Sequence, residues 1–150
     1  MTKPTASRAL LSENLKRYRT RLGVSQVELS LAAGLARNTV YYIEKKSPSV
    51  HLETINRLAI SLDVDPCVLL SHEAAASDGQ YRQRQLADCV ADNLRRFRTR
   101  LNLTQEEVAI SAGLARNYVY KIERKHVRVT LDTLDAIAQA LGALPWQLLA

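Results

Sequence analysis

The side chains with the clearest chemical capacity in this chain form a short polar set that occurs twice. Arg37 and Asn38 return, 79 positions later, as Arg116 and Asn117. Arginine can make two parallel hydrogen bonds to the edge of guanine, and asparagine can make two to adenine. Such a set could therefore read nucleic-acid bases. The alternative is a polar helix face that only meets solvent.

These residues lie within a repeat that covers most of the sequence. Residues 14–71 return without a gap as residues 93–150, and about half of the positions carry the same amino acid. A repeat of this length is too long for a solenoid unit, so we expect each copy to have its own core and its own target. We predict a first domain at residues 1–71, a linker at 72–80 and a second domain at 81–150.

Apolar residues recur at helical spacing, and no segment alternates polar and apolar residues for long enough to form a strand. The predicted fold class is therefore all-α. For the first copy we predict helices at residues 7–22, 26–32, 36–45, 52–62 and 66–70. For the second copy we predict a long first helix that begins near Arg82, because Leu86 extends its apolar stripe toward the N-terminus.

Two short helices joined by a tight turn are the most informative local pattern. Ser25, followed three residues later by Glu28, is a capping sequence that begins the first of these helices. Gly34 supplies the left-handed backbone conformation of the turn, and glycine recurs at position 113. Two helices joined in this way, the second followed by basic residues, form a helix-turn-helix.

The residues around this turn make a resemblance specific. Residues 26–44, QVELSLAAGLARNTVYYIE, resemble the core motif of the phage-repressor and Cro-like (xenobiotic-response-element) helix-turn-helix family, and the second copy is at least as similar. The resemblance covers nearly all of both copies. It implies two tandem lambda-repressor-like helix-turn-helix domains of about five helices each. It also implies that the second helix of each motif carries base-reading side chains.

The candidate base-reading residues lie just before that helix or on its outward face. They are Arg37, Asn38, Thr39, Tyr41 and Tyr42 in the first copy, and Arg116, Asn117, Tyr118, Tyr120 and Lys121 in the second. On a helical wheel, Val40, Ile43 and Ala36 point the other way, toward the core. Because two of the five positions differ between the copies, the copies should read similar but not identical half-sites.

A second set is expected to contact the sugar-phosphate backbone, which supplies affinity without sequence information. By the resemblance, this set comprises Gln26, Lys45, Lys46 and Ser49 in the first copy and Gln105, Arg124, Lys125 and Arg128 in the second. The resemblance also implies that the two glutamines brace the recognition helix. For the cationic residues, a charged loop without a ligand is the alternative.

Two opposite charges are retained as a pair in both copies, Arg19 with Glu44 and Arg98 with Glu123. The resemblance implies an ion pair that joins the first helix to the recognition helix. Its expected role is to orient the recognition helix, since a buried pair is sensitive to the loss of one partner. The alternative is an exposed pair that contributes little stability.

Charge and composition favour a polyanionic partner. The net charge is +6, and the copies carry it, with eight Lys or Arg against five Asp or Glu in the first and nine against five in the second. The two cysteines and three histidines show no disulfide or metal-ligand spacing. The sequence contains no catalytic motif, long apolar segment or signal-peptide core. We therefore expect a cytoplasmic protein that is not an enzyme and needs no cofactor or metal.

The expected function is sequence-specific transcription regulation, with repression by occupation of an operator. The expected partner is double-stranded DNA, bound by a homodimer or by a pseudo-dimer formed within one chain, without a membrane. The alternative is a regulator that binds another protein, such as an antitoxin or an antiactivator. Its docking surface would be the helix-turn-helix or the apolar residues Trp146, Leu148 and Leu149.

Overall fold

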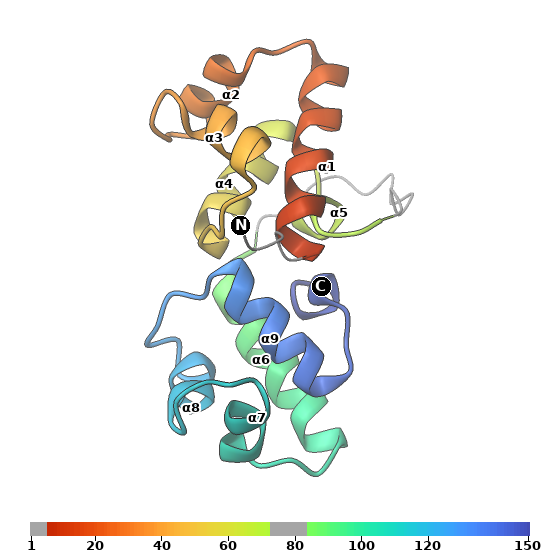
Figure 1. Cartoon of the computed structure of the whole chain (residues 1–150), viewed down its shortest axis with the longest axis vertical. Helices are drawn as coiled ribbons and strands as arrows, with labels where there is room; N and C mark the ends of the chain where they lie inside the picture. Colours follow the sequence, from red (N-terminus) through yellow and green to blue (C-terminus); the bar gives the residue numbers. More distant parts are fainter. Residues whose placement is uncertain (1–5, 73–83) are drawn as a thin grey trace.

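The molecule consists of two helical repeats stacked along its long axis (Figure 1). The computed structural model describes residues 6–72 and 84–150. The first repeat contains α1 (Ala6–Leu22), α2 (Gln26–Ala32), α3 (Thr39–Lys46), α4 (Leu52–Leu62) and α5 (Pro66–Leu69). The second contains α6 (Leu86–Arg100), α7 (Gln105–Ser111), α8 (Tyr118–Glu123), α9 (Leu131–Leu141) and the 3-10 helix η1 (Pro145–Leu148). In these residues the only extended pairing is one isolated bridge, so the all-α prediction is confirmed.

Local sequence signals set the ends of the helix-turn-helix elements as predicted. The Ser25 hydroxyl accepts a hydrogen bond from the backbone N–H of Glu28 and thereby caps α2. Gly34 has a φ of +70° and Gly113 a φ of +71°, in the left-handed region that favours glycine. The prediction of two short helices joined by a glycine turn is therefore confirmed in both repeats.

The predicted start of the recognition helix was wrong. α3 begins at Thr39 and not at Ala36. The N–H of Thr39 bonds the carbonyl of Ala36, so Arg37 and Asn38 form a turn that precedes the helix. Ala36 consequently is exposed, although the helical wheel placed it toward the core.

The long first helix of the second copy is also shorter than predicted. α6 begins at Leu86, and the preceding Gln85 has an extended backbone. Arg84 bonds the Asp65 carboxylate and the Leu149 carbonyl, and these contacts hold the chain in a non-helical path. Arg82 and most of the predicted linker lie outside the described residues.

A buried asparagine closes each repeat by joining its first helix to its last. The Asn14 amide donates to the carbonyls of Leu69 at 3.1 Å and Ser71 at 3.0 Å. Its counterpart Asn93 donates to two equivalent carbonyls at 3.0 and 2.8 Å. Both asparagines are buried. These bonds satisfy carbonyls at a helix end, where no backbone partner is available.

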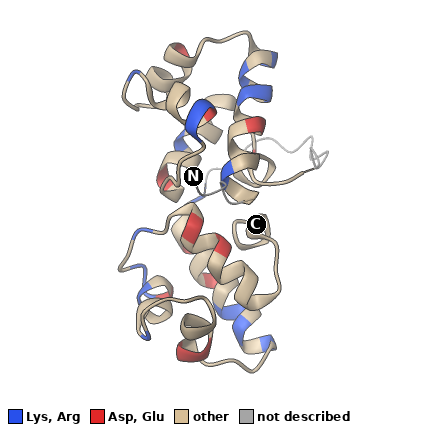
Figure 2. Ribbon diagram, viewed as in Figure 1, with Lys and Arg blue, Asp and Glu red and all other residues tan. Residues whose placement is uncertain are grey.

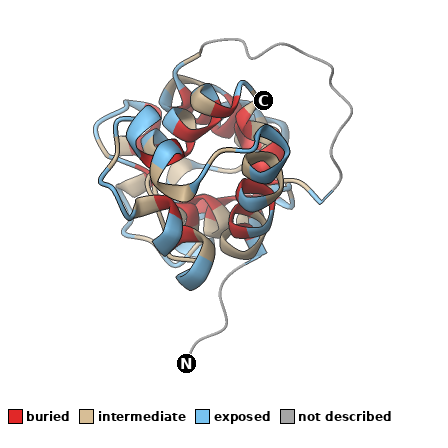
Figure 3. Ribbon diagram, turned by 90° about the horizontal axis from the view of Figure 1, so that it is seen from above, coloured by how far each residue is buried: buried red, intermediate tan, exposed pale blue. Residues whose placement is uncertain are grey.

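The two repeats share one continuous hydrophobic core. Leu15 and Ile55 of the first repeat belong to the same buried cluster as Leu94 and Leu134 of the second. The buried segments, red in Figure 3, face inward around the long axis. The expectation of a separate core for each copy was therefore wrong. A module of about 60 residues buries too little surface to be stable by a wide margin, and here each repeat covers apolar residues of the other.

The repeats are related by an approximate two-fold axis. The N–H of Leu52 donates to the carbonyl of Val129 at 3.0 Å, and the N–H of Leu131 donates to the carbonyl of Val50 at 2.9 Å. Each bond becomes the other when the residue numbers are exchanged by the repeat offset of 79. The same exchange converts the packing of α1 against α9 into that of α6 against α4. The interface thus has the isologous form of a symmetric dimer.

Replacement of Asn93 with Ala should lower the free energy of unfolding by about 2 kcal/mol, because two carbonyls lose their buried donor. Urea denaturation followed by circular dichroism measures the change. Gln139→Ala is the matched control, since this amide is exposed on α9 and its loss should cost about 0.5 kcal/mol or less. Equal losses in the two variants would show that the buried hydrogen bonds do not stabilise the repeat.

Candidate nucleic-acid interface

The second helix of each helix-turn-helix has one buried face and one exposed face. On α3, Val40 and Ile43 are buried, whereas Tyr41 is 45% exposed and Tyr42 is 54% exposed. α8 divides in the same way, and Tyr120 is 44% exposed. A polar and aromatic surface is therefore available on both helices, while the aliphatic side chains hold them to the core.

The structure brings the predicted base-reading residues together on this exposed side. Seven of the ten are exposed. Arg37 and Asn38 protrude from the turn before α3, and their counterparts occupy the same turn before α8. The three half-buried members are Thr39, Tyr118 and Lys121. Arginine and asparagine at the exposed start of a helix are placed to reach base edges in a major groove.

A buried ion pair ties α3 to α1. Arg19 donates from Nε and Nη2 to the two carboxylate oxygens of Glu44, at 3.0 and 2.8 Å. The side chains are 13% and 5% exposed. Arg19 also donates to the carbonyl of Val24 at 3.0 Å, and the Gln26 amide donates to Glu44 at 3.3 Å. The recognition helix is thus joined to α1, to α2 and to the loop between them.

The second repeat contains the same network. Arg98 donates to the Glu123 carboxylate at 2.8 and 3.4 Å and to the carbonyl of Leu103 at 3.0 Å. Gln105 donates to the same carboxylate at 2.6 Å, and Arg95 approaches it at 3.7 Å. Charge-assisted, two-pronged bonds of this kind fix geometry as well as supplying energy. The orientation of each recognition helix is therefore set within its own repeat.

The network gives the two glutamines a structural contact that the resemblance implied. Gln26 and Gln105 are half-buried, and each amide faces a glutamate carboxylate. A glutamine amide has two N–H donors. One remains for another acceptor, so the phosphate contact of these residues stays a prediction.

A tyrosine holds the first cation that follows each reading surface. The Lys45 ammonium donates to the Tyr41 hydroxyl at 2.8 Å and lies 5.3 Å from the centre of its ring. The Arg124 guanidinium lies 5.4 Å from the ring centre of Tyr120. The hydrogen bond with Tyr41 raises the pKa of Lys45 above its ordinary value. The predicted phosphate ligands thus begin directly beside the base-reading set.

Three other members of the predicted phosphate set have partners within the protein. The partners are Asp88 for Lys125 at 2.8 Å, Glu53 for Arg128 at 3.3 Å, and the Asp132 N–H for Ser49 at 3.1 Å. The last two contacts cross between the repeats. The roles of these residues toward phosphate stay predictions, and Lys46 is an exposed cation next to them.

Both helix-turn-helix units lie toward the same side of the molecule, at opposite ends of its long axis (Figure 1). Lys and Arg positions, blue on the ribbon of Figure 2, lie on α3 and on the loop after α8. The approximate two-fold axis exchanges α3 with α8. The two recognition helices therefore present equivalent exposed faces in opposite orientations on that side. One elongated partner could therefore meet both faces.

Comparison with known proteins identifies the family. The helix-turn-helix family profile matches residues 15–69 and again residues 94–149. This chain belongs to the phage-repressor and Cro-like helix-turn-helix family. α3 and α8 are the recognition helices of its two helix-turn-helix domains.

Parts of this chain are similar in sequence to known proteins. A hypothetical transcription factor of Neisseria meningitidis is 39% identical over 67 residues, which cover 45% of this chain and 63% of the relative. The control protein C.SmaI of Serratia marcescens is 42% identical over 57 residues, which cover 38% of this chain and 68% of the relative. The crystal structure of the Neisseria factor NHTF aligns with a TM-score of 0.43 at 39% identity, over 44% of this chain and 76% of that one. The match thus spans less than two thirds of the first relative.

Sequence reasoning missed the contacts between the two helix-turn-helix domains. The Arg84 guanidinium donates to both carboxylate oxygens of Asp65, at 2.7 and 2.9 Å. Burial opposes ionisation of this carboxyl, but the bonds from Arg84 and from the N–H of Cys67 outweigh it and lower the pKa of Asp65 to about 2. Neither charged residue is repeated in the other copy, so retention between copies gave no signal.

Other kinds of site are not evident in the described part of this helix-turn-helix chain. No helix there is both long and apolar enough to cross a membrane. In the same residues, His, Cys, Asp and Glu form no group that could hold a metal ion.

Replacement of Arg19 with Met should lower the free energy of unfolding by about 3 kcal/mol, because Glu44 is left buried without its cation. The control is Arg57→Met, which removes an exposed ion pair with Glu53 and an exposed hydrogen bond to the carbonyl of Gly34, and it should cost about 1 kcal/mol or less. Both variants are measured by urea denaturation. A loss for Arg19→Met no larger than that of the control would refute the bracing role of the buried pair.

Proposed function

We propose that this chain is a sequence-specific DNA-binding transcription regulator that represses by occupying an operator. The observation that carries the proposal is the exposure, in both repeats, of the same arginine and asparagine at the start of a recognition helix. Exposed cations lie in the last turn of α3 and in the loop after α8, and phosphate contacts from such residues would supply affinity. We infer that the protein acts on DNA in the cytoplasm.

The approximate two-fold axis supports an operator of two inverted half-sites. A two-fold protein matches a palindromic site, with half-site centres separated by about one helical turn, roughly 34 to 36 Å, or a multiple of it. In this chain the pair of reading surfaces is supplied by one molecule. Because the two repeats share one core, binding of one reading surface brings the other to the second half-site, which strengthens binding without new contacts. We therefore infer that the chain binds as an internal pseudo-dimer.

The operator should be an imperfect palindrome. Thr39 and Tyr42 of the first reading surface are Tyr118 and Lys121 in the second. Lysine can donate to guanine, whereas the aromatic side chain at the same position makes different contacts. The arginine and asparagine are common to both surfaces. The half-sites should thus share the bases that these two residues read and differ at neighbouring positions.

The alternative of a purely protein-binding regulator has weaker support. Leu148 and Leu149 were candidate docking residues, but both are fully buried. Leu31 of α2 and its counterpart Ile110 are 58% and 56% exposed. A protein contact through these two residues is compatible with DNA binding, because they do not belong to the base-reading or phosphate sets.

Arg37→Ala or Asn38→Ala should weaken binding to the operator by about 1 to 3 kcal/mol and leave binding to random duplex nearly unchanged, because these side chains read bases. Arg116→Ala and Asn117→Ala should act in the same way on the other half-site. Lys46→Ala is the contrasting variant, expected to weaken all sequences alike and to reduce the salt slope by about one unit. Salt-titrated binding assays measure both quantities. The base-reading role fails if the arginine and asparagine variants lose specific and random affinity equally.

Insertion of about five base pairs between the half-sites should abolish joint binding, because it rotates one half-site to the opposite face of the duplex. A full turn of about ten base pairs should also abolish it, since the shared core fixes the distance between the recognition helices. Footprinting on the altered operators gives the readout. Undiminished affinity after both insertions would mean that the domains bind independently or that one of them does not bind DNA.

A further inference from the structure

One part of the interface between the repeats would suit any pair of repeats. The two backbone hydrogen bonds on either side of the His51–Thr130 bridge use no side chains. They could form equally between two first repeats, or two second repeats, of different molecules. A tandem chain with only such contacts could join many molecules into an open assembly. The choice of partner must therefore come from the surrounding side chains.

The residues that meet at the axis differ in size. Cys67 lies against Trp146, its own counterpart in the repeat, with Sγ 3.5 Å from the tryptophan carbonyl oxygen. Both residues are half-buried. Two first repeats would bring two cysteines together and leave a gap, which costs stability. Both residues line a cavity of about 720 Å³, and two second repeats would bring two tryptophans to this place where one now lies. The small and large pair suits only unlike repeats.

The Asp65–Arg84 ion pair has no twin on the other side of the axis. By the repeat offset, the corresponding residues are Leu144 and Thr5. The two charged side chains are 23% and 22% exposed. Two first repeats would leave both copies of Asp65 without this cation, and two second repeats would set both copies of Arg84 against Leu144. A partly buried charge that loses its partner is destabilising.

A further contact is polar on one side of the axis and apolar on the other. The Ser7 hydroxyl donates to the Asp135 carboxylate. Across the axis, the corresponding residues are Leu86, which is buried, and Asn56. Two second repeats would therefore place Leu86 against Asp135, and the carboxylate would lose a donor at a desolvated site.

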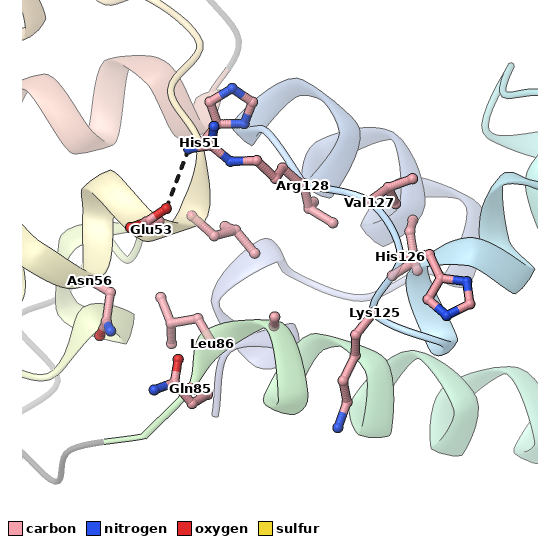
Figure 4. Close-up of a pocket in the computed structure, with 13 residues that line it drawn as sticks. His51, Glu53, Asn56, Gln85, Leu86, Lys125, His126, Val127 and Arg128 are labelled. Carbon is pink, nitrogen blue, oxygen red and sulfur yellow. Dashed lines mark hydrogen bonds and ion pairs between the residues drawn. The ribbon is translucent and has the colours of Figure 1, made fainter.

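The two sides are also filled differently. Arg8 donates to both carboxylate oxygens of Asp132. Its Nε lies 2.8 Å from Oδ1, and its Nη2 donates to Oδ2. The counterpart of Arg8 is Ala87, and a cavity of about 370 Å³ opens there beside the Glu53–Arg128 ion pair (Figure 4). These two ion pairs do not distinguish like from unlike repeats, because Glu53 and Asp132 occupy corresponding positions and are both acidic. Arg8 could pair with Glu53 between two first repeats, and Arg128 could pair with Asp132 between two second repeats. The cavity shows that the sides have nevertheless diverged.

We propose that each repeat carries an interaction surface that fits the other repeat and excludes a second copy of itself. The first repeat supplies the small residue and the acid at the axis, and the second supplies the large residue and the base. The chain consequently closes on itself as a monomer with one defined internal pairing. This property does not depend on DNA binding, so either proposal can fail without the other.

The test gives the two halves a free choice of partner. A protease recognition sequence inserted after Ala76 allows the folded full-length chain to be cut between the repeats. The cut protein is unfolded in urea and refolded, and native mass spectrometry then distinguishes mixed pairs from like pairs by mass. We expect an excess of mixed pairs of about tenfold, equivalent to about 1.4 kcal/mol. Mixed and like pairs in equal total amounts would overturn the proposal.

A second measurement uses the intact chain, in case the cut halves do not refold. Cys67→Trp should overfill the axis and Trp146→Cys should leave it underfilled, and each change should lower the unfolding midpoint by about 4 °C. The variant with both changes restores one large and one small residue and should recover more than half of the combined loss. Leu31→Trp with Trp146→Cys is the control, because Leu31 is exposed on α2, and the two losses in this pair should simply add. Simple addition of the losses in the test pair would contradict complementary fit.

Discussion

The backbone pairing at the approximate two-fold axis is the constraint on which the rest of the molecule depends. It joins residues 50–52 to residues 129–131, and these segments include the first residues of α4 and α9. These helices carry much of the buried apolar surface of their repeats. Once the two segments are paired, α1 must pack against α9 and α6 against α4, and the two cores become one. A module too small to be stable by a wide margin thereby gains a second hydrophobic face.

The backbone pairing at the axis also fixes the positions of the recognition helices α3 and α8. Each recognition helix ends a few residues before the paired segment, so its C-terminal end is fixed from the axis. The side of each helix is fixed by the glutamate that accepts bonds from arginine and glutamine. In the first repeat the Ser12 hydroxyl also donates to the carbonyl of Glu44 at 2.8 Å. A recognition helix held in this way need not reorient when it binds, and preorganisation of this kind favours affinity.

Local structure followed from sequence because it is governed by neighbours along the chain. The glycine at 34, the serine cap at 25 and the apolar spacing of residues 52–62 each predicted an element that the structure contains. Comparison of the two copies singled out Arg19 and Glu44, since opposite charges recur together, and the resemblance implied the ion pair that the structure contains. The start of α3 was misplaced because the turn that holds Arg37 uses a backbone bond with no sequence signal of its own.

The interface between the repeats could not be predicted from the sequence, because its contacts join residues that differ between the two copies. Cys67 with Trp146, and Asp65 with Arg84, become meaningful only when the axis is known. Residues that are the same in both copies indicate features that both repeats require. They give no information about features in which the repeats differ. The reading residues belong to the first kind and the pairing residues to the second. The role of the reading residues in DNA recognition rests on the proposed function, whereas their exposure is a property of the fold.

Joining both halves in one chain changes how such a regulator would respond to its own abundance. A regulator assembled from separate subunits loses its paired form on dilution, because the paired fraction depends on concentration. Here the halves share a core and a backbone, so the paired form persists wherever the chain is folded. Under the proposed function, operator occupancy would rise in direct proportion to protein at low abundance, and not with its square. A gene under its control would show a graded dose response from the first molecules made.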